Sequence, residues 1–137
     1  MFRRRKHVDV ISRLPLCATL SADEIAGLAG IAVEQRYPEG YELTREGNIG
    51  RSFFVMLDGQ AEVLRGQERV TIRNAGDFFG EIALIAKTPR TATVTSATDI
   101  SLLVITAQSF RTLLDHQPAI ASKVLAALAE RLAPEPI

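Results

Sequence analysis

The alternation of apolar and polar positions divides the chain into a helical start, a strand-rich middle and a helical end. Val8, Ile11 and Leu14 recur at a spacing of three residues, which places them on one face of a helix. Pro15 ends this helix, because the residue before a proline is pushed out of the α region.

A second helix is predicted to begin after Ser21. The Ser21 side chain is a natural N-cap, and Glu24 completes a capping box in which each side chain bonds the backbone N–H of the other residue. The helix then continues to about residue 30, with an apolar face formed by Ile25, Leu28 and Ala29.

Residues 33–106 contain short β-branched and aromatic runs that alternate with glycine-containing turns. The Asp58-Gly59 pair, between residues 53–57 and 60–64, predicts a β-hairpin with a two-residue turn. Many short strands with frequent turns favour a closed antiparallel roll over a parallel sheet. Further strands are expected at residues 70–72, 93–97 and 100–105.

The helical period returns after residue 106. Residues 107–115 form one predicted helix, and Pro118 suits the first turn of a last helix, which prolines at 134 and 136 end. A single apolar stripe runs along this last helix. It consists of Ile120, Val124, Leu125, Leu128 and Leu132.

The predicted fold class is therefore α+β, mainly β. An antiparallel β-roll or jelly roll is flanked by N-terminal helices and two C-terminal helices. We expect residues 1–20 to form a lead helix and junction, and residues 21–137 to form one domain. Within that domain the β-roll occupies about 33–106 and the C-terminal helices about 107–132.

Composition is typical of a globular domain, with 47% hydrophobic and 23% charged residues among 137. No apolar run is long enough to span a bilayer, and the basic start lacks the unbroken apolar core of a signal peptide. The single Cys17 cannot form an internal disulfide. These features predict a cytoplasmic location.

The charges balance, with 16 basic and 16 acidic side chains. No global field attracts nucleic acid, so we expect no nucleic-acid partner. The basic cluster at residues 3–6 has two interpretations: a solvated terminal tail, or a junction to a membrane segment whose cytoplasmic flank is basic.

The sequence offers little for catalysis. His7 and His116 lie far apart, and with Cys17 they suggest no cluster for a transition metal. No Ser-His-Asp arrangement is evident either. We therefore expect no enzyme activity, no catalytic residues, no metal and no cofactor.

The segment at residues 76–94 carries the most specific chemistry. Gly80 allows a turn or the close approach of a ligand, and residues 81–85 could form a helical turn whose first N–H groups favour an anion. Arg90 could give a phosphate bidentate hydrogen bonds, while Glu81 could accept hydrogen bonds from sugar hydroxyls. The alternative is an ordinary surface loop with a buried salt bridge between Glu81 and Arg90.

The order of residues in this segment resembles a known family. Phe79-Gly80-Glu81-Ile82-Ala83-Leu84, followed by Pro89-Arg90-Thr91-Ala92, closely resembles the phosphate-binding cassette of the cyclic-nucleotide-binding domain family. That family includes catabolite-activator-type regulators, protein-kinase regulatory subunits and cyclic-nucleotide-gated channels. The resemblance covers nearly the whole chain, and residues 79–94 are called the cassette segment below.

The resemblance implies distinct roles within the cassette segment. Arg90 would neutralise the cyclic phosphate, and Glu81 would bind the ribose 2′-hydroxyl. The backbone amides of Gly80, Ile82 and Ala83 would complete the cradle for the sugar and phosphate.

Other positions are implied less directly. Thr91 stands where relatives carry Ala, Ser or Thr, and its hydroxyl permits cGMP without requiring it. Val63 and Val70 are candidates to contact the base, with core packing as the alternative. Arg131 matches a lid arginine near the end of the last helix in channel-type relatives, with a favourable interaction with the helix dipole as the alternative. Leu128 would supply apolar lid surface or belong to the core.

The resemblance implies a regulatory sensor that binds cAMP or cGMP. We expect the cytosolic domain of a membrane protein, such as a ligand-gated ion channel, that acts through movement of the C-terminal helix and could form oligomers through its parent protein. The alternatives are a regulatory domain of another effector (an enzyme or transcription regulator) and a degenerate protein-interaction domain. A cupin-type metal enzyme is disfavoured, because no histidine lies between His7 and His116.

Overall fold

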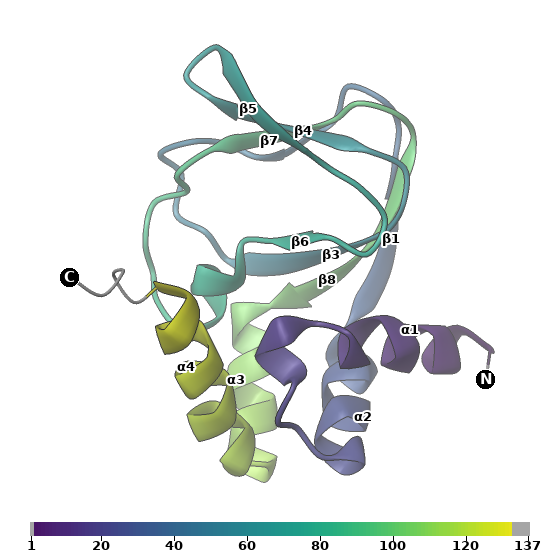
Figure 1. The fold of residues 1–137 in the computed structure, drawn as a ribbon, viewed down its shortest axis with the longest axis vertical. Coiled ribbons are helices and arrows are strands. Elements are labelled where there is room, and N and C mark those ends of the chain that lie inside the picture. Colours follow the sequence, from purple (N-terminus) through teal and green to yellow (C-terminus); the bar gives the residue numbers. More distant parts are fainter. Residues whose placement is uncertain (1, 133–137) are drawn as a thin grey trace. The chain divides into compact units, whose positions relative to one another are not determined.

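The computed structural model of the chain describes residues 2–132, and the side chains of residues 6–130 (Figure 1). The chain divides into two compact units. A helical unit comprises the described residues up to Ile31 and those from Ser109 onward, and a strand unit comprises Ala32–Gln108. The predicted fold class is confirmed: two antiparallel sheets and four α-helices make up the described chain.

The helices follow the predicted apolar stripes. The elements are α1 (Phe2–Ser12), a 3₁₀ turn η1 (Pro15–Cys17), α2 (Ala22–Ile31), α3 (Ala107–His116) and α4 (Ala119–Leu132). Leu125 departs from its predicted stripe and is 48% exposed. The Leu132 side chain lies outside the described residues. The residues of these stripes that are buried are Ile11, Leu14, Leu28, Ala29, Ile120, Val124 and Leu128.

The predicted capping box forms at the start of α2. The Ser21 N–H donates to Glu24 Oε1 at 2.8 Å, and the Glu24 N–H donates to Ser21 Oγ at 3.2 Å. Lys123 Nζ of α4 donates to the same Oε1 at 2.7 Å. The hydrogen bonds from Lys123 and from the Ser21 backbone lower the pKa of the Glu24 carboxyl. One carboxylate thus joins the start of α2 to α4.

The strand unit consists of two four-stranded antiparallel sheets. The first has the order β1 (Val33–Tyr37), β8 (Ile100–Thr106), β3 (Ser52–Asp58), β6 (Phe78–Phe79). The second has the order β2 (Glu42–Thr44), β7 (Thr93–Ser96), β4 (Ala61–Arg65), β5 (Glu68–Arg73). The first and last strands of the unit in chain order, β1 and β8, are paired, with Val33 opposite Val104.

The strand unit has an apolar core made of residues from both sheets. Phe54 of β3 and Phe79 of β6 stack, with ring centroids 4.8 Å apart. This aromatic pair matters for the site, because β6 leads directly into the cassette segment. The buried members of the core are Phe54, Met56, Ala61, Val63, Phe79, Val94, Ile100 and Leu102.

The predicted hairpin at Asp58-Gly59 is wrong. The turn joins β3 to β4, but these strands belong to different sheets. After the turn, Gln60 bonds another segment: its N–H donates to Thr98 Oγ1 at 3.0 Å, and its carbonyl accepts from the Ala97 N–H at 2.9 Å. Gly59 has a φ of +88°, so the turn itself was correctly located. The hairpin in this region is β4–β5.

Substituting Gly59 tests this change of sheet. A Cβ at Gly59 would collide with the Asp99 carbonyl oxygen, in addition to the cost of a positive φ. Gly66→Ala is the matched control, since Gly66 has a φ of +65° but open space around its Cβ position. We expect Gly59→Ala to lower the free energy of unfolding by about 3 kcal/mol and Gly66→Ala by about 1 kcal/mol in urea titrations. Equal losses would contradict the close approach.

The Glu24–Lys123 pair predicts a pH dependence of stability. Because the folded pKa of Glu24 is below its ordinary value of 4.5, its stabilisation is complete above that value and is lost as the pH falls through the lowered pKa. Glu24→Gln keeps a capping acceptor but loses the charge. We expect its deficit in urea midpoint relative to wild type to be present at pH 7 and to shrink below pH 4.5.

The control is Glu42→Gln. Glu42 also pairs with a basic side chain, Arg45, but both are exposed, at 41% and 66% of their side chains. An exposed pair contributes little to stability. A deficit for Glu42→Gln as large as that for Glu24→Gln would argue against a special role for the Glu24 pair.

Candidate functional site

The Arg90 guanidinium occupies a half-buried position in the strand unit. Its Nη2 donates to the backbone carbonyl of Ser52 at 2.7 Å. Its Cζ lies 5.7 Å from the centroid of the Phe54 ring, within the range of a cation–π interaction. The guanidinium is therefore held by a carbonyl of β3 and by an aromatic ring of the same strand.

Two glycines leave room for this guanidinium. A Cβ on Gly80 would lie 2.5 Å from Arg90 Nη1, and a Cβ on Gly50 would lie 2.8 Å from Arg90 Cζ. Gly80 also has a φ of +80°, which glycine adopts readily, and it precedes a 3₁₀ turn, η2 (Glu81–Leu84). The predicted turn after Gly80 is therefore present, in 3₁₀ form.

The positive charge of Arg90 has no carboxylate partner in the part of the chain whose side chains the structure describes. Among the residues that the structure describes, no ion pair involves Arg90, and Glu81 does not pair with it. The predicted alternative of a Glu81–Arg90 salt bridge is therefore wrong. Burial lowers the pKa of the Arg90 guanidinium, but an arginine stays protonated at neutral pH. A half-buried cation with such surroundings suits a bound anion.

The backbone on either side of Arg90 is fixed to the loop that follows β2. The Arg90 N–H donates to the Asn48 carbonyl at 2.7 Å, and the Arg90 carbonyl accepts from the Gly47 N–H at 2.9 Å. The Gly50 N–H donates to the Thr88 carbonyl at 3.1 Å. These bonds set the position of Arg90 before any ligand is present.

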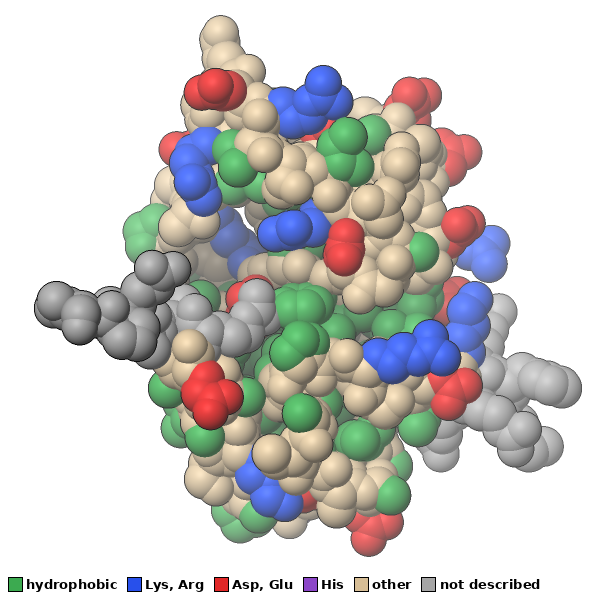
Figure 2. Space-filling view, in the orientation of Figure 1, with side chains coloured by type: hydrophobic (Ala, Val, Ile, Leu, Met, Phe, Trp, Pro, Cys, Tyr) green, Lys and Arg blue, Asp and Glu red, His purple; other side chains and the backbone are tan. Residues whose placement is uncertain are grey.

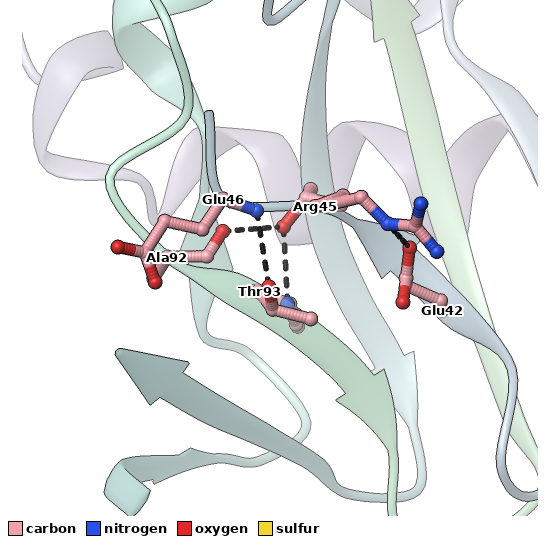
Figure 3. Close-up of polar contacts among 7 residues, drawn as sticks. Glu42, Arg45, Glu46, Ala92 and Thr93 are labelled. Atoms are coloured by element: carbon pink, nitrogen blue, oxygen red, sulfur yellow. Dashed lines mark hydrogen bonds and ion pairs between the residues drawn. The ribbon is translucent and has the colours of Figure 1, made fainter. Parts of the chain in front are cut away.

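Hydrogen bonds from residues 44 and 46 hold the end of the cassette segment (Figure 3). Buried Thr44 donates through Oγ1 to the Ala92 carbonyl at 3.1 Å and accepts from the Val94 N–H at 3.1 Å. The Glu46 N–H donates to Thr93 Oγ1 at 3.0 Å. The Thr44 hydroxyl thus bridges the register shift between β2 and β7.

The two predicted base contacts differ in position. Val63 is 8% exposed and belongs to the core of the strand unit. Val70 is 50% exposed on β5. The register shifts beside it, since Val63 pairs with Thr71 and Leu64 pairs with Arg69, which leaves Val70 as the extra residue of a bulge.

The other predicted site residues surround Arg90 or lie elsewhere. Ile82 and Ala83 belong to η2, and the Ala83 N–H already donates to the Gly80 carbonyl at 3.1 Å. Thr91 is exposed, and its carbonyl accepts from Arg65 Nε at 3.3 Å. The Arg131 side chain lies outside the described residues, so its predicted role is not tested. Leu128 is buried in the helical unit at 1% exposure.

Sequence reasoning missed several residues that position Arg90. Ser52 acts through its backbone carbonyl, which any residue would provide, so no sequence signal marks it. Gly50 is one of many glycines in predicted turns, and nothing in the sequence indicates that it lies against Arg90. Thr44 and Glu46 act through contacts with residues 47 or more positions away, which spacing along the chain does not reveal.

Three further features of the described residues bear on the kind of site this chain has: its surface, its potential metal ligands and the hydrophobicity of its helices. The strand unit is hollowed on one side in the space-filling view, and basic side chains, drawn in blue, lie in the hollow (Figure 2). Within residues 2–132, no set of three His, Cys, Asp or Glu side chains is placed to hold a metal ion. None of the helices in that range is both long and apolar enough to cross a membrane.

Comparison with known proteins gives consistent matches. The sequence model of the cyclic nucleotide-binding domain matches residues 34–117. The cAMP-dependent protein kinase regulatory subunit of Neurospora crassa is 32% identical, over 96% of this chain and 35% of that protein. A cyclic nucleotide-gated potassium channel of Rhizobium etli is 32% identical, over 90% of this chain and 34% of that protein. The chain therefore spans about a third of the length of these relatives.

A solved structure shares the fold across almost the whole chain. The N-terminal domain of a transcriptional regulator from Streptomyces coelicolor superposes with a TM-score of 0.83 and 29% identity, covering 90% of each chain. The likeness extends over both the helices and the strands.

Removing the Thr44 hydroxyl tests how the cassette segment is fixed. Thr44→Val keeps the shape but leaves the buried Val94 N–H and the Ala92 carbonyl without this partner. We expect a loss of about 2 kcal/mol in the free energy of unfolding. The control Thr71→Val removes only a 3.5 Å contact and should change it by less than about 0.5 kcal/mol. Similar losses for both variants would show that the bridge is unimportant.

Proposed function

We propose that this chain, which belongs to the cyclic nucleotide-binding domain family, binds cAMP or cGMP and acts as the regulatory sensor of a larger protein. The observation that carries the proposal is the half-buried Arg90 guanidinium, which has no carboxylate partner among the described residues. Family membership supports the class of ligand, and this charge supports Arg90 as the proposed partner of its phosphate.

In the proposed complex, different residues of the cassette segment bind the phosphate and the ribose. Arg90 neutralises the cyclic phosphate through charge-assisted hydrogen bonds, which are stronger than neutral ones. Glu81 accepts a hydrogen bond from the ribose 2′-hydroxyl. The backbone of Gly80 and of residues 82–83 contacts the sugar and phosphate, with the Ala83 N–H shared between the ligand and the Gly80 carbonyl.

The base is proposed to contact apolar strand surface. Val63 offers buried surface inside the strand unit, and Val70 offers exposed surface at the bulge of β5. The Thr91 hydroxyl is available to a phosphate oxygen or to a guanine amino group, so both cAMP and cGMP are candidate ligands. Arg131 is proposed as a further contact to the base from α4.

The regulatory step is proposed as a shift between two arrangements of the C-terminal helix. A ligand changes such an equilibrium only by the difference in its affinity for the two states. One relative is named as a cyclic nucleotide-gated channel and another as a cAMP-dependent kinase regulatory subunit. We propose a non-catalytic, cytosolic module that gates a membrane channel or another attached effector in this way.

Calorimetric titration with cAMP and cGMP tests the proposal. We expect the wild-type chain to bind at least one of them, and Arg90→Ala to weaken that binding by about 100-fold or more, because a half-buried charge pair is lost. Heat that stays flat for both nucleotides up to high micromolar concentration would refute the proposed ligand class.

The matched control is Arg45→Ala. It removes the same charge from an exposed arginine whose side chain pairs with Glu42 at 2.7 Å. We expect its affinity to stay within about two-fold of wild type, since exposed charges are screened. If the two variants lost affinity equally, the effect would belong to net charge and not to the Arg90 position.

A further inference from the structure

Glu46 lies between the cassette segment and the turn that joins β4 to β5. Its backbone N–H donates to Thr93 Oγ1 at 3.0 Å, a contact drawn in Figure 3. Its side-chain Oε1 accepts from the Gly66 N–H, in the β4–β5 turn, at 2.8 Å. A single residue therefore contacts the cassette segment with its backbone and the turn with its carboxylate.

A second contact joins the same turn to the same segment. Arg65 Nε donates to the Thr91 carbonyl at 3.3 Å. Thr91 follows Arg90 directly, and Thr93 lies two residues further on. The β4–β5 turn is thus connected to Thr91 directly, through Arg65, and to Thr93 indirectly, through Glu46.

Beyond the strand pairs Leu64–Thr93 and Arg65–Glu68, the turn lies at the edge of its sheet. β5 is an edge strand that pairs with β4 on one side only. The pairing of the hairpin is interrupted by the bulge at Val70, a few residues from the tip. Residues 65–70 are all exposed, and a Cβ on Gly66 would meet nothing within 4 Å.

We propose that Glu46 is a positioning residue of the nucleotide site, which fastens the β4–β5 turn to the end of the cassette segment and so keeps Arg90 and Thr91 in place around a bound ligand. This inference rests on the proposed function and adds a residue that does not touch the ligand. Because the fastened segment contains the phosphate-binding arginine, loosening it speeds the release of ligand more than it slows binding.

The proposed role of Glu46 depends on its hydrogen bond to the turn and not on its negative charge. A carboxylate near an anion site opposes a phosphate electrostatically. Removing that charge alone should therefore leave binding unchanged or slightly stronger. Removing the hydrogen-bond acceptor should weaken binding, so the two effects have opposite signs and separate cleanly.

Three variants of the full chain separate them. Glu46→Ala removes both the charge and the acceptor, whereas Glu46→Gln removes the charge and keeps a side-chain oxygen as acceptor. Glu42→Ala removes the same charge from a nearby carboxylate that contacts Arg45 and not the turn. All three are compared by stopped-flow fluorescence with a labelled cAMP or cGMP, whichever the wild type binds more tightly.

We expect Glu46→Ala to release the nucleotide about five-fold faster, the change that the loss of one ordinary hydrogen bond produces, with its association rate nearly unchanged. Glu46→Gln and Glu42→Ala should release it within about two-fold of the wild-type rate. Equal release from Glu46→Ala and Glu42→Ala would overturn the inference, as would release from Glu46→Gln as fast as from Glu46→Ala.

Two further measurements keep this test independent of folding and of the proposed function. In the ligand-free protein, the Gly66 amide should exchange hydrogen faster in Glu46→Ala than in Glu46→Gln, and unchanged exchange would overturn the inference. If Glu46→Ala folds poorly, Arg65→Ala loosens the same turn from Thr91, and wild-type release from it would count against the role of the turn. A wild-type chain that binds neither nucleotide would instead refute the proposed function itself.

Discussion

The half-buried charge of Arg90 is the constraint on which the arrangement of the candidate site depends. Removing a charge from water is costly unless hydrogen bonds or an opposite charge compensate. Here the Ser52 carbonyl and the Phe54 ring give partial compensation, and Gly50 and Gly80 leave the space that the guanidinium needs. In the proposed complex an anionic ligand would supply further compensation, so a phosphate would gain more from this arginine than from an exposed one.

Binding at such a site benefits from the order already present. Residues 44–50 bond the cassette segment at Arg90 itself through Asn48 and Gly47, before it through Gly50, and after it through Thr44. The entropy of ordering these backbone atoms is therefore lost during folding and not during binding. This explains why a site built on irregular segments can still present a fixed geometry.

Sequence reasoning succeeded where the determining contacts are local and failed where they depend on pairing. The capping box of Glu24 involves residues three apart, and the order of residues around Arg90 was enough to single out that segment. Glycine at the 58–59 turn shows that the chain reverses, but not which sheet the next strand joins. The exposure of Val70 follows from a register shift, and Ser52 contributes only its backbone carbonyl. Neither feature depends on the type of residue, so neither could be predicted from the sequence.

The division of the chain brings both crossings between its units next to one sheet. The chain passes between the helical and strand units twice, after Ile31 and after Gln108. The strands that adjoin these crossings, β1 and β8, are hydrogen-bonded to each other, with Val33 opposite Val104. Both crossings therefore adjoin the same sheet, in which β8 pairs with β1 on one side and with β3 on the other. Because Ser52 of β3, whose carbonyl accepts from Arg90, lies opposite Thr106 of β8, the strand that ends at the second crossing is paired with the strand that holds the guanidinium.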